Sequence, residues 1–207
     1  TAGMIFGFLR SFGLFLLRVP MILLGLPVVW VALPYSYATT MFHQTFTQFP
    51  QYGSWSQIRL PKWALWWDNA FDGMLGDKRG WWANECKGDH AARYNMWRWA
   101  ALRNPANYFS RNVCGVDVST LRIALVDGAG MAESAPYRGW YLLKGMAAGG
   151  KVYPRFYLEY ALTDTHGLMI DIGYKIKLSH NGTAPDAAEK DRVKGIVAVI
   201  SPWKELS

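Results

Sequence analysis

The sequence has 207 residues and a mass of 23.4 kDa, which allows one domain of ordinary size plus an appendage. Apolar residues make up 51% and charged residues only 18% of the chain, and this excludes a disordered or polyelectrolyte protein. Two cysteines exclude a disulfide-dense miniprotein. The net charge is 22 − 15 = +7, and no run of adjacent basic residues is longer than Lys78-Arg79. Nucleic-acid sites cluster their cations, so we expect an anionic lipid surface, not a nucleic acid, as the partner of this sparse basic charge.

The first segment of the chain is almost entirely apolar. Between residues 4 and 35 only Arg10 and Arg18 are charged, and residues 19–35 carry no charge. A helix that crosses a membrane needs about 20 mostly apolar residues, and Arg18 can lengthen the uncharged stretch by extending its head group toward water. The sequence therefore predicts a hydrophobic anchor over residues 1–35.

The form and orientation of this anchor stay open in the sequence. Pro20 and Pro27 disfavour a helix interior, so the anchor is either one helix or a kinked helix pair; a buried core hairpin and a cleaved signal peptide are the alternatives. Arg10 and Arg18 precede the uncharged stretch, and the next basic residue is Arg59. If the segment spans, this asymmetry places the N-terminus in the cytoplasm. If it lies in the interface, the rest of the chain stays cytoplasmic.

Tryptophans dominate the middle of the chain. After a polar and aromatic stretch, Trp63, Trp66 and Trp67 recur at the spacing of one helix face. Indole rings favour the membrane–water boundary, because the ring is apolar and its N–H needs a partner. We expect some of these rings in a core and others at an interface. The residues predicted to contact a membrane or partner are Phe6, Leu9, Phe15, Leu23, Val28, Trp30, Trp63, Trp66, Trp67, Trp81 and Trp82.

Acidic residues crowd the same region. Asp72, Asp77 and Glu85 are candidates for a carboxylate pair that performs acid–base chemistry on a sugar. The alternative is a glycine-punctuated turn in which aspartates cap helix starts and pair with nearby cations. The spacing fails the calcium-loop pattern, and no paired C-x-x-C occurs, so we predict no metal site. Phosphate-loop and dinucleotide motifs are missing too, and we predict no cofactor.

The last third of the chain has a β pattern. Five β-rich runs with partial alternation begin at residue 121, and turn signals such as Asp127-Gly128 and Gly149-Gly150 separate them. Short connections favour an antiparallel meander. The chain is therefore predicted to be α+β, with a hydrophobic N-terminal helix, a tryptophan-rich helical middle and a C-terminal antiparallel β-meander. The predicted parts are an anchor over 1–35, a linker over 36–59 and one domain over 60–207, helical over 60–112 and β-rich over 121–203.

Three stretches of the sequence resemble a known group of proteins. Residues 63–86, 96–111 and 173–177 are similar to a family of uncharacterised proteins from tailed bacteriophages, with a hydrophobic start and a WWDN…DGxLGDKRGWW core motif. The resemblance covers most of the chain and implies a viral origin. It implies no reaction, because the family has no assigned catalytic residues.

These observations lead to one main functional hypothesis and two alternatives. The main hypothesis is a non-enzymatic bacteriophage protein, membrane-anchored or a minor virion component, acting by insertion or docking of its apolar N-terminus. Its partners would be membrane lipid, other phage structural proteins or further copies of the same chain. Its location would be the host inner membrane or the virion. The alternatives are a carboxylate-dependent hydrolase of cell-wall glycan and a basic DNA-contacting protein inside the particle.

Overall fold

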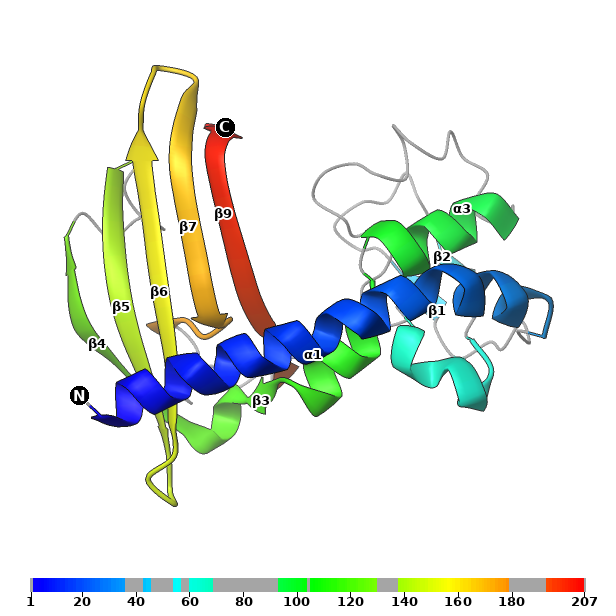
Figure 1. Cartoon of the computed structure of the whole chain (residues 1–207), viewed down its shortest axis with the longest axis horizontal. Helices are drawn as coiled ribbons and strands as arrows, with labels where there is room; N and C mark the ends of the chain where they lie inside the picture. Colours follow the sequence, from blue (N-terminus) through cyan, green and yellow to red (C-terminus); the bar gives the residue numbers. More distant parts are fainter. Residues whose placement is uncertain are drawn as a thin grey trace. The chain divides into compact units, whose positions relative to one another are not determined.

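The computed structural model has an α+β fold: a long N-terminal helix, a short helical middle and a C-terminal antiparallel sheet (Figure 1). This confirms the fold class that the sequence predicts. The chain divides into two compact units, unit 1 with Thr1–Leu17 and Ser110–Ser207 and unit 2 with Arg18–Phe109. The division into anchor, linker and domain stays a prediction. The structure describes residues 2–35, 43–45, 54–56, 60–68, 93–103, 105–129, 138–178 and 193–206, of which 43–45, 54–56 and 138 are described by their backbone alone.

Helix α1 is one continuous α-helix over Ala2–Ala32, followed by the short 3-10 turn η1 over Leu33–Tyr35. Its 31 residues correspond to a length of about 46 Å. Of the two forms that the sequence leaves open, the structure has the single helix, with Pro20 and Pro27 inside it. Each proline removes one backbone donor from the helix, and packing against neighbouring segments must offset that loss.

Unit 1 is built on a five-stranded sheet in which every neighbouring pair is antiparallel. The strand order is β4-β5-β6-β7-β9, so each strand of this sheet pairs with the next strand of the same sheet along the chain, and the predicted antiparallel meander is confirmed. A separate short pair joins β3 (Val116–Asp117) to β8 (Val193–Lys194), and the 3-10 turn η7 covers Val118–Thr120. The sheet strands are β4 (Leu121–Ala129), β5 (Arg138–Ala147), β6 (Val152–Ala161), β7 (His166–Tyr174) and β9 (Ile196–Glu205).

One of the predicted turns is wrong. Asp127-Gly128 lies inside β4, where the register with β5 shifts between Leu125 and Asp127. The Asp127 carboxylate accepts a hydrogen bond from the Gly128 N–H at 2.8 Å, so the dipeptide forms a local kink in a paired strand. By contrast, Gly150 has a φ of 77° and its N–H bonds Ala147 O at 2.9 Å. The predicted turn between β5 and β6 is confirmed.

Unit 2 contains short helical pieces around an apolar core. The 3-10 helix η3 covers Lys62–Trp67, and α3 covers Arg93–Trp97 and continues as the π-helical segment η5 over Arg98–Arg103. The strand β1 (His43–Thr45) pairs with β2 (Ser54–Ser56). A second π-helical segment, η6, covers Phe109–Val113; only its first residue belongs to unit 2, and the rest belongs to unit 1. The helical middle is therefore confirmed in type, in shorter pieces than the predicted range. The buried core consists of Val29, Ala32, Leu33, Leu60, Ala64, Met96, Trp99, Ala100 and Ala101.

Candidate membrane-contacting surface

The exposed positions of α1 carry only apolar residues. In the part of α1 that belongs to unit 1, the large side chains at exposed positions are 52–69% exposed. The other exposed positions of the helix are alanine, glycine or proline. Soluble proteins rarely leave such a continuous apolar surface without a partner. We call this surface the outer face of α1; its large residues are Ile5, Phe6, Leu9, Phe12, Leu16, Leu17, Val19, Leu23, Leu24, Trp30 and Val31.

The opposite side of the helix carries small residues where it meets the sheet of unit 1. A Cβ atom added to Gly7 would lie 2.5 Å from Pro154 Cδ, and one added to Gly3 would lie 3.0 Å from Val152 Cγ2. Ser11 is buried, and its hydroxyl donates to Phe8 O at 2.8 Å. At Gly3, Gly7 and Ser11 small residues thus face the sheet, while the large residues at the exposed positions face outward. A soluble amphipathic helix has the reverse arrangement, whereas small residues at packing contacts are typical of helices in membranes.

Arg10 also points toward unit 1. Its Nε donates to the Tyr174 hydroxyl at 2.9 Å and a terminal nitrogen donates to Val152 O at 2.6 Å. The guanidinium carbon lies 4.4 Å from the ring centre of Tyr153, a cation–π distance. Tyr174 is only 1% exposed, and burial raises the pKa of its hydroxyl while the bond from Arg10 opposes that shift. The charge in this part of α1 is therefore held on the protein side.

Unit 2 contacts its part of the helix in the same way. A Cβ atom on Gly25 would lie 2.8 Å from Trp67 Cδ1, so glycine allows an indole ring to lie against the helix. The Trp67 and Trp97 indole N–H groups donate to Met21 O and Leu26 O, each at 2.7 Å. These bonds satisfy the polar atoms of two largely apolar rings.

Two further arginines hold the ends of this second part. Arg18 donates to Pro105 O at 3.2 Å. Arg93 donates to Trp30 O, and its guanidinium carbon lies 4.3 Å from the Trp30 ring centre. The last four carbonyls of a helix lack partners within the helix, and a cation at the C-terminal end also interacts favourably with the negative end of the helix dipole. Arg93 therefore caps the C-terminal end of α1.

Exposed aromatic rings of unit 2 lie on η3 and α3. Trp63, Trp66 and Tyr94 are each more than half exposed. Trp66 contacts the Phe109 ring at 5.7 Å between centres, and Tyr94 stacks on Trp97 at 6.1 Å. Trp99, by contrast, belongs to the buried core. The described tryptophans thus divide between core and surface, and a place of the exposed rings at an interface stays a prediction.

The structure describes nine of the eleven residues predicted to contact a membrane or partner. Six are exposed: Phe6, Leu9, Leu23, Trp30, Trp63 and Trp66. Three are half-buried: Phe15, Val28 and Trp67, the last two packed against the core of unit 2. Trp81 and Trp82 lie outside the described residues, as do the candidate acids Asp72, Asp77 and Glu85. Membrane contact and glycan chemistry at these positions stay predictions.

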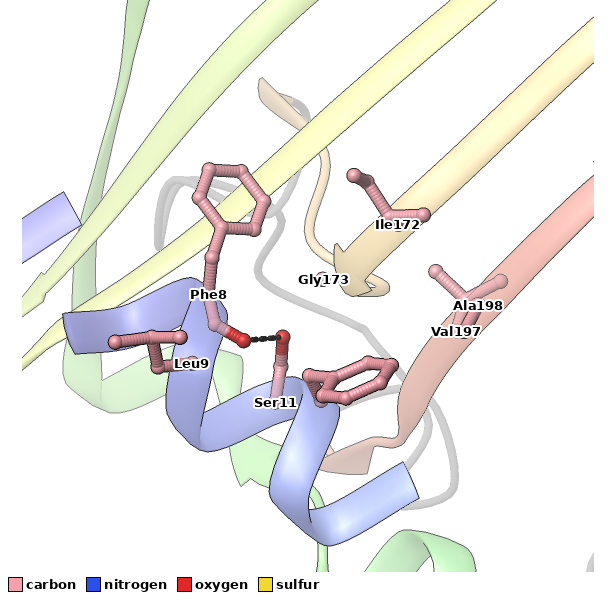
Figure 2. A pocket seen from close by; sticks show the side chains of 8 residues that line it. Phe8, Leu9, Ser11, Ile172, Gly173, Val197 and Ala198 are labelled. Atoms are coloured by element: carbon pink, nitrogen blue, oxygen red, sulfur yellow. Dashed lines mark hydrogen bonds between the residues drawn. The ribbon is translucent and has the colours of Figure 1, made fainter. Parts of the chain in front are cut away.

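A small apolar groove lies between α1 and the sheet of unit 1 (Figure 2). Its volume is about 220 Å³, below the 300–1,000 Å³ that is usual for small-molecule sites. None of the described residues that line it is titratable, and the Ser11 hydroxyl donates to Phe8 O (Figure 2). Its lining residues are Phe8, Leu9, Ser11, Phe12, Ile172, Gly173, Val197 and Ala198.

The sheet of unit 1 carries a polar network that sequence analysis missed. Arg155 donates to both Asp171 oxygens at 3.0 and 3.1 Å and to Ile176 O at 2.9 Å. Glu159 accepts hydrogen bonds from the Tyr157 hydroxyl at 2.8 Å and from Lys204 Nζ at 2.6 Å. The Asp171 carboxylate is thus paired with the Arg155 guanidinium, and the Glu159 carboxylate is paired with the Lys204 ammonium group. The alternation of residues 155, 157 and 159 along β6 is the signal that could have placed them on one face.

Burial and the hydrogen bond to Glu159 raise the pKa of the Tyr157 hydroxyl well above its ordinary value. Tyr157 therefore stays protonated and donates to the carboxylate. Within the described ranges, no group of three histidine, cysteine or acidic side chains has the arrangement of a metal site. The described polar groups of this sheet form an ion-pair network.

The fold and the outer face of α1 define an α+β protein whose N-terminal helix is long and apolar enough, by length and composition, to cross a membrane. The chain belongs to a family of unknown function, DUF7338, whose model matches residues 4–207. Comparison with curated proteins and with solved structures finds no match to the chain.

Proposed function

We propose that this chain is a non-enzymatic, membrane-anchored protein that inserts the outer face of α1 into lipid. One observation carries the proposal: every exposed residue of α1 is apolar, while both of its arginines bond to groups on the protein side. A charge on the outer face would cost about 2.5–3.5 kcal/mol at the membrane centre. The orientation of the two arginines avoids that cost.

The apolar area is sufficient for stable anchoring. Burying a large apolar side chain is favourable by about 1.5–3 kcal/mol when that side chain is fully exposed beforehand. The outer-face residues are on average about half exposed, so each contributes roughly 1 kcal/mol and together on the order of 10 kcal/mol. A single myristoyl chain binds with a constant of about 10⁴ M⁻¹, or roughly 5.5 kcal/mol, which is marginal. The helix face therefore has about twice the driving force of one acyl anchor.

The composition of the outer face favours lipid over a protein partner. Protein interfaces contain about one hydrogen bond per 100–200 Å² and a polar rim. The outer face offers no side-chain donor or acceptor except the Trp30 indole. Exposed indole and phenol rings of unit 2, together with the net charge of +7, match the chemistry of an anionic headgroup region.

A bacteriophage origin, and with it a place in the host inner membrane or the virion, is part of the proposal and rests on the resemblance of the WWDN…DGxLGDKRGWW motif. Mass spectrometry of purified particles distinguishes the two places. Peptides of this chain in particles would support a minor virion component. Peptides only in the membranes of infected cells would support a host-membrane protein.

Lipid flotation with one matched pair of variants tests the anchor. Leu16 on α1 is 53% exposed and Leu162 is 52% exposed, so glutamate at either site changes the exposed surface equally. Leu16→Glu removes apolar burial and adds a charge to the outer face, and we expect its partition into phosphatidylcholine–phosphatidylglycerol vesicles to fall about tenfold or more. Leu162→Glu should float like the unaltered chain. Equal partition of the two variants would contradict the proposal, as would failure of the unaltered chain to float.

A further inference from the structure

We propose that α1 lies in the plane of one membrane leaflet and does not cross the bilayer. The inference rests on the proposed membrane anchoring and adds the depth and direction of the helix. It follows from three arginines that the protein binds along the helix, and from the way the inner side of the helix is covered.

The arginine contacts leave no stretch of helix long enough to span. Arg10 and Arg18 are 18 − 10 = 8 residues apart, or about 12 Å along the axis. Arg18 and Trp30, the residue that Arg93 caps, are 30 − 18 = 12 residues apart, or about 18 Å. The hydrocarbon core of a bilayer is about 30 Å thick. Any spanning position of α1 therefore places at least one guanidinium at membrane depth.

These guanidinium groups are not available to extend toward water. Arg10 is bonded to Tyr174 and Val152 in unit 1, and Arg18 is bonded to Pro105 in unit 2. Extending either arginine to a headgroup would break those bonds. A spanning helix would instead carry its bonded neighbours into the hydrocarbon region with it.

The neighbours of α1 in unit 1 do not suit that region. Gly3 and Gly7 lie against Val152 and Pro154 of β6. The same strand carries Arg155 and Glu159, and among the described strands β4 and β9 stand at opposite ends of the sheet, each with one free edge. Lipid-exposed sheet edges do not occur in hydrocarbon, since their backbone groups would lack partners.

A helix that lies in the plane of the leaflet keeps both the arginine guanidinium groups and the open sheet out of the hydrocarbon region. Ser11, Arg18, Gly25 and Ala32 recur every seven residues, and each is buried or half-buried. Leu9, Leu16, Leu23 and Trp30 recur every seven residues on the exposed side. Interfacial helices bury one apolar face about 5–10 Å into the headgroup and acyl boundary. Within each unit the outer face then meets acyl chains, and the arginine that the unit binds stays on the side of that unit and the aqueous phase.

Depth-dependent fluorescence quenching tests this orientation. An environment-sensitive nitrobenzoxadiazole label is attached to the full chain at one position at a time, in Leu9→Cys, Leu16→Cys, Leu23→Cys and Trp30→Cys, which span about 32 Å of helix. A Cys86→Ser background removes one native thiol, and Cys114 is 1% exposed. Leu162→Cys reports an exposed position outside α1. Val31→Cys replaces Trp30→Cys if loss of the Arg93 contact impairs folding. The vesicles contain phosphatidylcholine and phosphatidylglycerol, with bromine atoms at shallow or deep acyl positions.

The in-plane helix predicts that all four α1 labels shift to the blue and that the same shallow bromine position quenches each of them most strongly. Deep bromines quenching Leu16→Cys and Leu23→Cys most strongly, with shallow quenching at Leu9→Cys and Trp30→Cys, would overturn the in-plane orientation and leave membrane anchoring intact. Absence of any spectral shift at the four positions would overturn both the anchoring and its orientation.

Discussion

Adding one methyl group to α1 at two alternative positions tests how closely the helix packs on the sheet. Gly7 and Gly13 both lie inside α1, so replacing either by alanine stabilises the helix by the same 0.5–1 kcal/mol, roughly, through backbone entropy. At Gly13 nothing lies within 4 Å of the new Cβ. At Gly7 the new Cβ would lie 2.5 Å from Pro154 Cδ and 2.9 Å from Val152 O. Such overpacking costs about 1–3 kcal/mol.

The entropic gain cancels between the two variants, so Gly7→Ala should be less stable than Gly13→Ala by about 1–3 kcal/mol. For a chain of this size 1 kcal/mol shifts the unfolding midpoint by about 2–4 °C, and the two midpoints should differ by roughly 2–12 °C. Thermal unfolding followed by circular dichroism in detergent micelles measures the difference. Equal stabilisation by the two substitutions would refute the close contact of α1 with β6.

Three further substitutions test the polar contacts of unit 1. Arg155→Met leaves Asp171 without its guanidinium partner in a largely buried site, and it should lower the free energy of unfolding in urea by about 3–5 kcal/mol. The control Arg122→Met, at an exposed position, should change this free energy by less than about 0.5 kcal/mol. Similar losses in the two variants would mean that the pair of Arg155 and Asp171 contributes little. The pKa of Tyr157 is raised in the folded state, so its contribution is complete below the ordinary pKa of 10.0 and is lost as the pH rises above it. The unaltered chain should therefore lose more stability between about pH 9 and about pH 11 than Tyr157→Phe, and equal losses would contradict the shift. Arg10→Lys keeps the charge but not the planar fork, and the unfolding midpoint should fall by an amount equivalent to about 1–2 kcal/mol; an unchanged midpoint would show that the fork is not needed.

The sheet could be predicted from the sequence because its strands alternate and the connections from β5 to β6 and from β6 to β7 are short. The Gly149-Gly150 turn also followed from local chemistry, since Gly150 adopts a positive φ. Asp127-Gly128 has the same turn chemistry, but pairing with β5 continues through it, and the dipeptide forms a kink within the strand. Tertiary pairing overrode the local preference there.

The orientation of α1 could not be predicted. Large apolar residues occur on every side of the helix, so hydrophobic periodicity does not distinguish an outer face from an inner one. The distinction depends on partners far away in sequence: Arg10 bonds to Tyr174, 164 residues later, and Arg18 bonds to Pro105, 87 residues later. The ion pair of Arg155 and Asp171 likewise depends on the register of β6 against β7.

Photo-crosslinking from the middle of α1 tests the central claim most directly. A benzophenone amino acid replaces Leu16 in one sample and Leu162 in another, and each chain is irradiated with phosphatidylcholine–phosphatidylglycerol vesicles. Lipid insertion predicts phospholipid adducts by mass spectrometry from position 16 and none from position 162. Adducts only to protein at position 16, whether to a second copy or to another chain, would contradict a lipid-facing helix.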